Sequence, residues 1–293
     1  MSDDAPASAL PPTPLIGNAR SQELLETASK YLYRELPEGK LNAWLVHPAD
    51  LDLETERLPA LVFLHGGMWD ISTPHQFIPH CHHFVTRGMI TITANYRTRE
   101  NLGGGPLEAM EDVRQLITFL KTHAHVLGID ASRITVVGAS SGGHAALCSV
   151  LHPAIGPHGE IFRPDGLILF GPISDTHTRK GSTDGKLRDL FPNPRLAKVS
   201  SPQALLPQKN LPPCLLMHGT ENKSVPFETS TRLAKLYRKK GNHCELNPFT
   251  GQGHTFFNYN PADPNYDITL RMIDHFLVEQ NLLEPDPEPD LVS

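Results

Sequence analysis

The stretch Ile134–Gly143, ITVVGASSGG, decides the fold of this 293-residue chain. A β-rich run of four residues leads directly into a serine pair between glycines, and a helix-like stretch of small residues, 141–151, follows. Runs of this kind, without strict alternation and bounded by glycine, are typical of parallel strands buried on both faces. The stretch therefore predicts a buried strand, a tight turn and a helix in immediate succession.

Similar runs recur along the chain. They lie at 61–65, 89–96, 167–170, 214–217 and, more weakly, 244–248. Amphipathic helical patterns alternate with them at 107–123, 229–240 and 267–280. Two extended runs within 31–47 flank Pro37-Glu38-Gly39 and predict an antiparallel hairpin. Together these patterns predict an α/β fold, a mostly parallel twisted sheet with helices on both faces and an N-terminal antiparallel hairpin.

The composition indicates one globular domain. Hydrophobic residues make up 39 % of the chain and charged residues 20 %, which is enough apolar material for a sizeable core. Both ends are rich in proline and acidic residues, so we expect a disordered or loosely packed head at 1–20 and a disordered acidic tail at 284–293. The single domain then spans 21–283. Its segment 175–210 shows no clear element and predicts a rim or lid insertion.

Charge and hydropathy exclude several classes of partner. The net charge is −6, from 26 basic and 32 acidic residues, and no basic patch indicates nucleic-acid binding. No run of about 18 apolar residues predicts a membrane span, and no basic amphipathic helix predicts binding to a membrane surface. The first residues lack a secretory signal, so we expect a cytoplasmic protein. Nothing in the sequence indicates an oligomeric state.

Gly138-Ala139-Ser140-Ser141-Gly142 matches G-x-S-x-G between a predicted strand and a predicted helix. That context is the one in which a serine is held on a sharp turn as a nucleophile, because small residues two positions away avoid collisions. The helix N-terminus aimed at the turn favours negative charge there. The motif therefore predicts Ser140 as a catalytic nucleophile, the alternative being an ordinary glycine-rich turn.

His65-Gly66-Gly67-Met68-Trp69 follows another predicted strand. Glycines at a strand end let backbone N–H groups approach a developing oxyanion, and such donors are each worth roughly 2.7–4 kcal/mol in comparable enzymes. We expect the N–H groups of Gly67, Met68 and Ser141 to form an oxyanion hole. The alternative is a turn that needs glycine for a positive φ.

A third motif, Gly251-Gln252-Gly253-His254, follows the last predicted strand. Its position late in the sheet predicts His254 as the general base toward Ser140. The walls of the pocket are expected in 68–80, 172–210 and 255–262, with Phe256, Phe257 and Tyr259 as an aromatic rim.

A histidine cluster at 75, 80, 82 and 83 raises the question of a metal. The stretch reads better as an amphipathic helix with its apolar residues facing inward, and no Cys/His set has the spacing of a zinc site. We therefore predict no metal and no organic cofactor.

The chain resembles α/β-hydrolases of the hormone-sensitive-lipase and bacterial feruloyl and acetylxylan esterase-like group. The resemblance covers roughly residues 40–282. The motifs that carry it are HGGMW at 65–69, ANYR at 94–97, GIDASRITVVGASSGGHAA at 128–146, HGTENKSVP at 218–226 and GQGHTFF at 251–257. It implies an α/β-hydrolase fold and a serine hydrolase acting on small-molecule carboxylic esters through a Ser-His-acid triad.

The family pattern H-G-T-x-D-x-x-V-P implies that the acid of the triad lies at position 222, which is an asparagine here. An amide supplies no charge, and in a well-studied triad this exchange lowers kcat about 10⁴-fold. Three interpretations remain open at this stage. Asn222 orients His254 in a weakened enzyme, Glu221 reaches the histidine, or Asp175 supplies the carboxylate from the previous strand end. The rival to an esterase is a catalytically impaired hydrolase-fold protein that binds a ligand.

Overall fold

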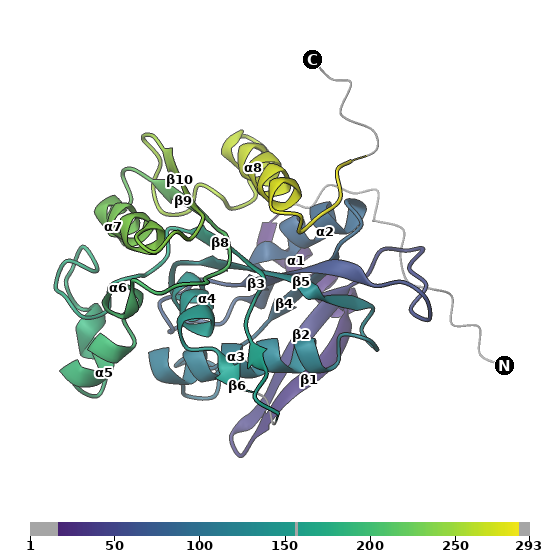
Figure 1. The fold of residues 1–293 in the computed structure, drawn as a ribbon, viewed down its shortest axis with the longest axis horizontal. Coiled ribbons are helices and arrows are strands. Elements are labelled where there is room, and N and C mark those ends of the chain that lie inside the picture. The colour runs from purple at the N-terminus through teal and green to yellow at the C-terminus, as the bar shows by residue number, and fades with distance from the viewer. Residues whose placement is uncertain (1–16, 156–157, 287–293) are drawn as a thin grey trace.

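A computed structural model describes residues 17–155 and 158–286, and its centre is an eight-stranded sheet (Figure 1). In sequence order its strands are β1 (Ser29–Leu36), β2 (Gly39–Val46), β3 (Leu58–Leu64), β4 (Ile90–Ala94), β5 (Ile129–Ala139), β8 (Gly166–Phe170), β9 (Cys214–Gly219) and β10 (Cys244–Phe249). The order across the sheet is β1-β2-β4-β3-β5-β8-β9-β10. The pairs β1–β2 and β2–β4 are antiparallel and the remaining pairs are parallel. The predicted α/β-hydrolase architecture with its N-terminal hairpin is therefore confirmed.

Helices cover both faces of this sheet. They are α1 (Gly17–Thr27), η1 (Pro74–Phe77), α2 (Ile78–Thr86), α3 (Pro106–Thr122), α4 (Ser140–Leu151), η2 (Leu187–Leu190), α5 (Pro194–Val199), α6 (Pro202–Leu205), α7 (Phe227–Arg238) and α8 (Asn265–Glu279). Side chains from α3, α4 and α7 form one buried cluster with the sheet, and side chains from α2 and α8 form a second cluster on the opposite face (Figure 1). The apolar strands thus lie between two cores, as their composition requires.

Local sequence explains where α3 begins and which face it buries. Pro106 occupies its first turn, where a missing N–H costs nothing, and the Glu108 carboxylate accepts the Gly105 N–H at 2.9 Å. Ala109, Val113 and Leu116 then recur at spacings of three and four and are buried. This helix and α4 pack side by side beneath the central strands.

Several segments differ from what the sequence predicted. Helix α1 begins inside the expected loose head, and the small β6 (Ala154–Ile155) and β7 (Ile161–Phe162) hairpin was not anticipated. The segment 175–210 contains η2, α5 and α6, where no element was expected. Of the predicted head and tail, residues 1–16 and 287–293 lie outside the described residues.

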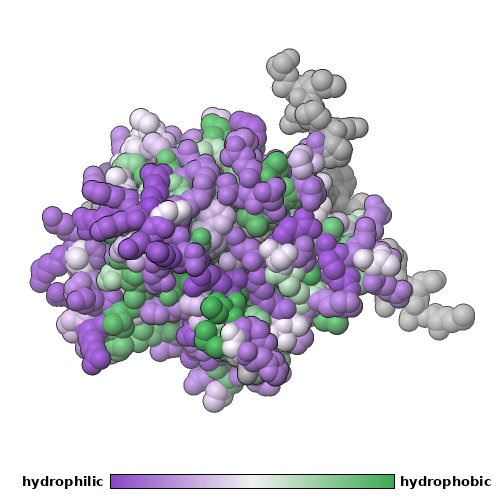
Figure 2. Space-filling model, in the orientation of Figure 1, coloured by the Kyte–Doolittle hydropathy of each residue, from purple (hydrophilic) through white to green (hydrophobic). Residues whose placement is uncertain are grey.

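The surface seen in Figure 2 is mostly hydrophilic, with small separate apolar patches. Single exposed apolar side chains are normal on globular proteins. Among the residues that the structure describes, no helix combines the length and the apolar character needed to cross a bilayer.

Candidate active site

Ser140 lies where β5 ends and α4 begins, in the turn that its motif predicted. Its φ is +52°, in the left-handed region that residues with a Cβ rarely adopt. The flanking glycines are required by packing. A Cβ on Gly138 would lie 2.7 Å from the carbonyl oxygen of Gly142, and a Cβ on Gly142 would collide with the carbonyl oxygens at the end of β3. Glycine at both positions therefore lets the start of α4 approach the strand ends closely.

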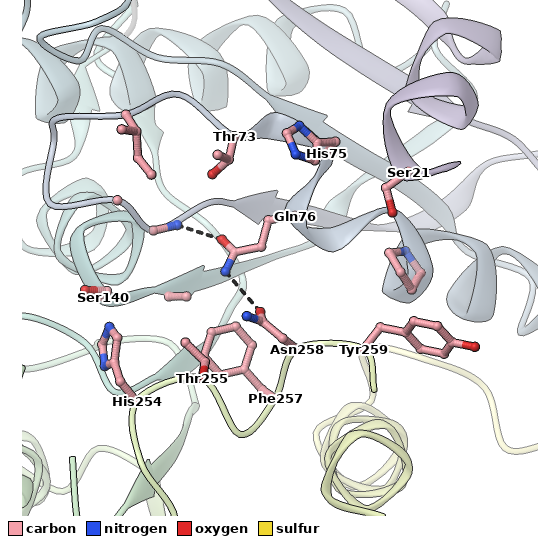
Figure 3. Close-up of a pocket in the computed structure, with 15 residues that line it drawn as sticks. Ser21, Thr73, His75, Gln76, Ser140, His254, Thr255, Phe257, Asn258 and Tyr259 are labelled. Atoms are coloured by element: carbon pink, nitrogen blue, oxygen red, sulfur yellow. Dashed lines mark hydrogen bonds between the residues drawn. The ribbon is translucent and has the colours of Figure 1, made fainter. Parts of the chain in front are cut away.

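A cavity of about 400 Å³ opens beside this serine (Figure 3). It is bounded by the loop after β3, the loop after β10 and helix α1. Its lining residues are Ser21, Gly66, Gly67, Ile71, Thr73, His75, Gln76, Pro79, Ala139, Ser140, His254, Thr255, Phe257, Asn258 and Tyr259. Ser140 is only 3 % exposed, so its hydroxyl is approached through this cavity rather than from open solvent.

The loop after β3 has the unusual backbone expected of an oxyanion loop. Gly67, Met68 and Trp69 have φ values of +121°, +55° and +57° in succession. Gly67 lines the cavity, whereas the Met68 side chain is 40 % exposed and lies outside the lining. Ser141 is fully buried in the first turn of α4 and also lies outside the lining. Of the three predicted oxyanion donors, the structure therefore places Gly67 on the cavity wall itself.

His254 follows β10 in a loop and lines the same cavity, where Figure 3 shows its ring beside Ser140. The side chain is half-buried, and burial lowers its pKa from the ordinary value of 6.5. A lowered pKa keeps the imidazole neutral near pH 7, which is the form that a general base needs.

Asn222 lies in the loop after β9 and is 7 % exposed. Its Oδ1 accepts the backbone N–H groups of Ser224 and Val225, each at 3.0 Å. Two backbone donors fix the orientation of the amide, because the opposite rotamer would place the Nδ2 donor against them. The Nδ2 group consequently faces His254 Nδ1 at 2.8 Å.

This contact decides the tautomer of His254. An amide NH₂ group can only donate, so Nδ1 accepts and the ring proton resides on Nε2. Nε2 is the ring nitrogen that Asn222 does not contact, and in this form it carries a proton and cannot take another from a hydroxyl. A carboxylate at the same position would accept a hydrogen bond from Nδ1–H, which keeps the ring proton on Nδ1 and leaves Nε2 free as a base.

The structure separates the three candidates for the acid. Asn222 is within hydrogen-bond distance of His254. Glu221 is exposed, on the outside of the same loop. The Asp175 carboxylate accepts the backbone N–H groups of His177 and Thr178 in its own loop and lies 3.8 Å from Arg232 Nη1 of α7, so its oxygens are used away from His254.

The cavity walls match the sequence prediction in two of three segments. Residues from 68–80 and 255–262 line the cavity, including Phe257 and Tyr259 of the expected aromatic rim, while Phe256 is buried against Phe249. The lining contains no residue of 172–210, whose helix α6 packs against α4 and α7 instead. Gln76, Asn258 and Ser21 were not singled out from the sequence, and no motif marks them.

The histidine cluster is dispersed by the fold. His75 faces the cavity, whereas His80 is buried among aromatic rings, where burial lowers its pKa to about 3. His82 and His83 are half-buried on α2. Within 17–155 and 158–286, no group of three or more His, Cys, Asp or Glu side chains is arranged to hold a metal ion.

The chain is similar to several known proteins. Residues 50–154 match the BD-FAE family. The native structure of esterase 2 from Thermogutta terrifontis, described as a thermophilic esterase, is 34 % identical, with a TM-score of 0.80 over 89 % of this chain and 95 % of that one. The same esterase phosphorylated by paraoxon superposes with a TM-score of 0.79 at 32 % identity, over 88 % of this chain and 96 % of that one.

Longer proteins are also similar to this chain. A probable isoprenylcysteine alpha-carbonyl methylesterase from Oryza sativa subsp. japonica is 26 % identical over 269 residues, covering 83 % of this chain and 60 % of the relative. Esterase LipC from Mycobacterium tuberculosis is 24 % identical over 248 residues, covering 78 % of this chain and 59 % of the relative. The chain thus spans little more than half the length of these two relatives.

Proposed function

This chain belongs to the esterases of the α/β-hydrolase fold, and from that premise we propose that it hydrolyses carboxylic esters through an acyl-enzyme on Ser140. The observation that carries the proposal is the meeting of three groups at one cavity. They are Ser140 on a left-handed turn, the His254 ring beside it and Gly67 of the oxyanion loop.

In this reaction Ser140 Oγ attacks the ester carbonyl carbon while His254 Nε2 takes the hydroxyl proton. The carbonyl oxygen becomes an oxyanion and accepts N–H groups of Gly67, Met68 and Ser141. The intermediate collapses, and the leaving alcohol takes the proton from His254. Water then attacks the acyl-serine while His254 takes its proton, and the collapse of this second intermediate returns the proton to Ser140 Oγ and releases the acid.

Asn222 occupies the position of the triad's acid in this proposal, and it makes the enzyme a weak one. With the amide on Nδ1, the productive tautomer of His254 is populated only when this contact is broken. The contact between Asn222 and His254 also favours a second candidate function, which is ligand binding by a catalytically impaired hydrolase-fold protein that turns its ligand over poorly.

The substrate class follows from the cavity and the relatives. A cavity of about 400 Å³ suits a small molecule. The relatives named as methylesterases and esterases act, by those names, on esters. We assign a small-molecule ester to this site.

Two measurements test the proposal. A fluorophosphonate probe should label Ser140, and the label should be absent from Ser140→Ala. An activated aryl ester should then give a burst of product followed by steady turnover, which distinguishes an esterase from a binding protein. Labelling of Ser140→Ala would refute the nucleophile, and ester binding without any product would favour the second candidate.

A further inference from the structure

The cavity is crossed by a pair of amide side chains that the proposed reaction does not use. Figure 3 shows Gln76 and Asn258 between the end that holds Ser140 and His254 and the end that holds Ser21 and Tyr259. Gln76 belongs to η1, and Asn258 lies four residues after His254. Both side chains are half-buried.

The Gln76 side chain is held at both of its polar atoms. Its Oε1 accepts the Gly66 N–H at 2.9 Å, and its Nε2 donates to Asn258 Oδ1 at 3.1 Å. The backbone N–H can only donate, so the Gln76 amide has one orientation and Asn258 must present its oxygen. The pair therefore links the loop after β3 to the loop after β10 by side chains 182 residues apart in the sequence.

This link lies close to the reacting centre. A Cβ on Gly66 would be 3.5 Å from Ser140 Cβ, so the peptide that Gln76 holds is adjacent to the nucleophile. A substrate group that extends from Ser140 toward Ser21 meets the two amides. A short substrate group ends before the two amides. A longer alkyl group would break the hydrogen bond between Gln76 and Asn258 and leave their polar atoms against the alkyl chain, which is unfavourable.

We infer that the Gln76–Asn258 pair determines specificity by limiting the length of the substrate group beside Ser140, so that this site takes short-chain esters. The inference rests on the proposed ester hydrolysis. Gln76 and Asn258 act here by closing the space next to the nucleophile, and they take no part in proton transfer.

The test compares kcat/KM for two ester series, one varying the acyl chain of p-nitrophenyl esters and one varying the alcohol of acetates. Both are needed because either group can extend toward Ser21. They are measured with the unaltered chain, Gln76→Ala, Asn258→Ala and Asn258→Asp, each also in an Asn222→Asp background to raise the signal. Thermal unfolding of each variant establishes that it is folded.

The unaltered chain should prefer short groups in one series. One methylene in a pocket changes kcat/KM roughly 10–200-fold, so the ratio of long-chain to short-chain kcat/KM should rise at least about 10-fold in both alanine variants. The change should appear mainly in KM for the long esters. Asn258→Asp is the matched control, because its carboxylate still accepts the Gln76 N–H and should keep the original ratio.

Equal ratios in the unaltered chain and in both alanine variants would overturn the inference, as would equal rates for long and short esters in the unaltered chain. If Gln76→Ala does not fold, Asn258→Ala decides alone, because it leaves the Gly66–Gln76 hydrogen bond in place. Failure of the proposed function has a different signature, namely no hydrolysis of even the shortest esters and no labelling of Ser140.

Discussion

Asn222→Asp is the change that tests the catalytic site most directly. The side chains are nearly isosteric, and Oδ1 of an aspartate would still accept the N–H groups of Ser224 and Val225. The second carboxylate oxygen would replace Nδ2 at 2.8 Å from His254 Nδ1. Nδ1 would then carry the ring proton, and Nε2 would become a free base facing Ser140.

The expected gain follows from the same exchange in a well-studied triad, where an amide in place of the carboxylate lowers kcat about 10⁴-fold. At 1.36 kcal/mol for each factor of ten, that is about 5.4 kcal/mol of transition-state stabilisation. Even one tenth of the effect would raise kcat about 10³-fold. KM should change much less, because the carboxylate acts chiefly as the imidazolium forms.

The assay is steady-state hydrolysis of a short p-nitrophenyl ester by the unaltered chain and by Asn222→Asp. Glu221→Gln and Asp175→Asn serve as controls, since the structure places neither carboxylate at His254. Both controls should keep their kcat within a few-fold. If Asn222→Asp leaves kcat unchanged while one control abolishes activity, the acid lies at the control position and the reasoning about residue 222 is wrong.

Three further outcomes are expected. A fluorophosphonate should label Ser140 alone, and labelling at another serine would remove it as the nucleophile. Burial lowers the pKa of His80 to about 3, against about 6.5 in the unfolded chain, so the unfolded state binds a proton that the folded state excludes. The free energy of unfolding should therefore fall by about 1.4 kcal/mol per pH unit for this residue as pH drops from 6.5 toward 4, and less steeply in His80→Phe. Urea midpoints at several pH values measure this, and equal slopes in both proteins would contradict it. Deleting 284–293 removes the partly exposed ion pairs of Asp286 with Arg87 and of Glu284 with Arg133, each worth about 0–1 kcal/mol, so Tm should fall by only a few degrees. A fall of more than about 10 °C would show that the tail packs on the domain.

The parts of the fold that the sequence predicted are those in which burial dictates composition. Strands such as β5 and β8 are enclosed on both faces, so their apolar runs stand out without any alignment. The hairpin of β1 and β2 was marked by its Pro-Glu-Gly turn. The short helices of 175–210 were missed because they are only four to six residues long and rich in proline and polar residues.

The cavity residues likewise divide into those that a local sequence pattern marks and those that it does not. The turn at Ser140 is predictable because it requires glycine neighbours that the sequence displays, whereas His254 is predicted from the order of the motifs along the chain. Which of Asn222, Glu221 and Asp175 lies beside His254 depends on how the loops after neighbouring strands fold against one another, and the side chain that the structure brings within hydrogen-bond distance is that of Asn222. The hydrogen bond between Gln76 and Asn258 could not be predicted, because neither segment contains a sequence pattern that indicates a contact with the other.

The surroundings of residue 222 suit a carboxylate better than the amide present. His218 Nε2 lies 2.9 Å from the Val225 carbonyl oxygen, which can only accept, so Nε2 carries the proton. Its Nδ1 lies 2.7 Å from Ser230 Oγ, which supplies the hydrogen that Nδ1 then accepts. Asn222 Nδ2, 3.1 Å from His218 Nε2, therefore faces one donor in His218 and one acceptor in His254. A carboxylate oxygen in its place would accept the N–H of His254 Nδ1 and share the His218 Nε2–H with the Val225 carbonyl oxygen, while its partner oxygen kept the two backbone N–H groups. Every polar group around position 222 can thus serve an anion without rearrangement, which is why a single substitution is expected to restore the base rather than to require a rebuilt loop.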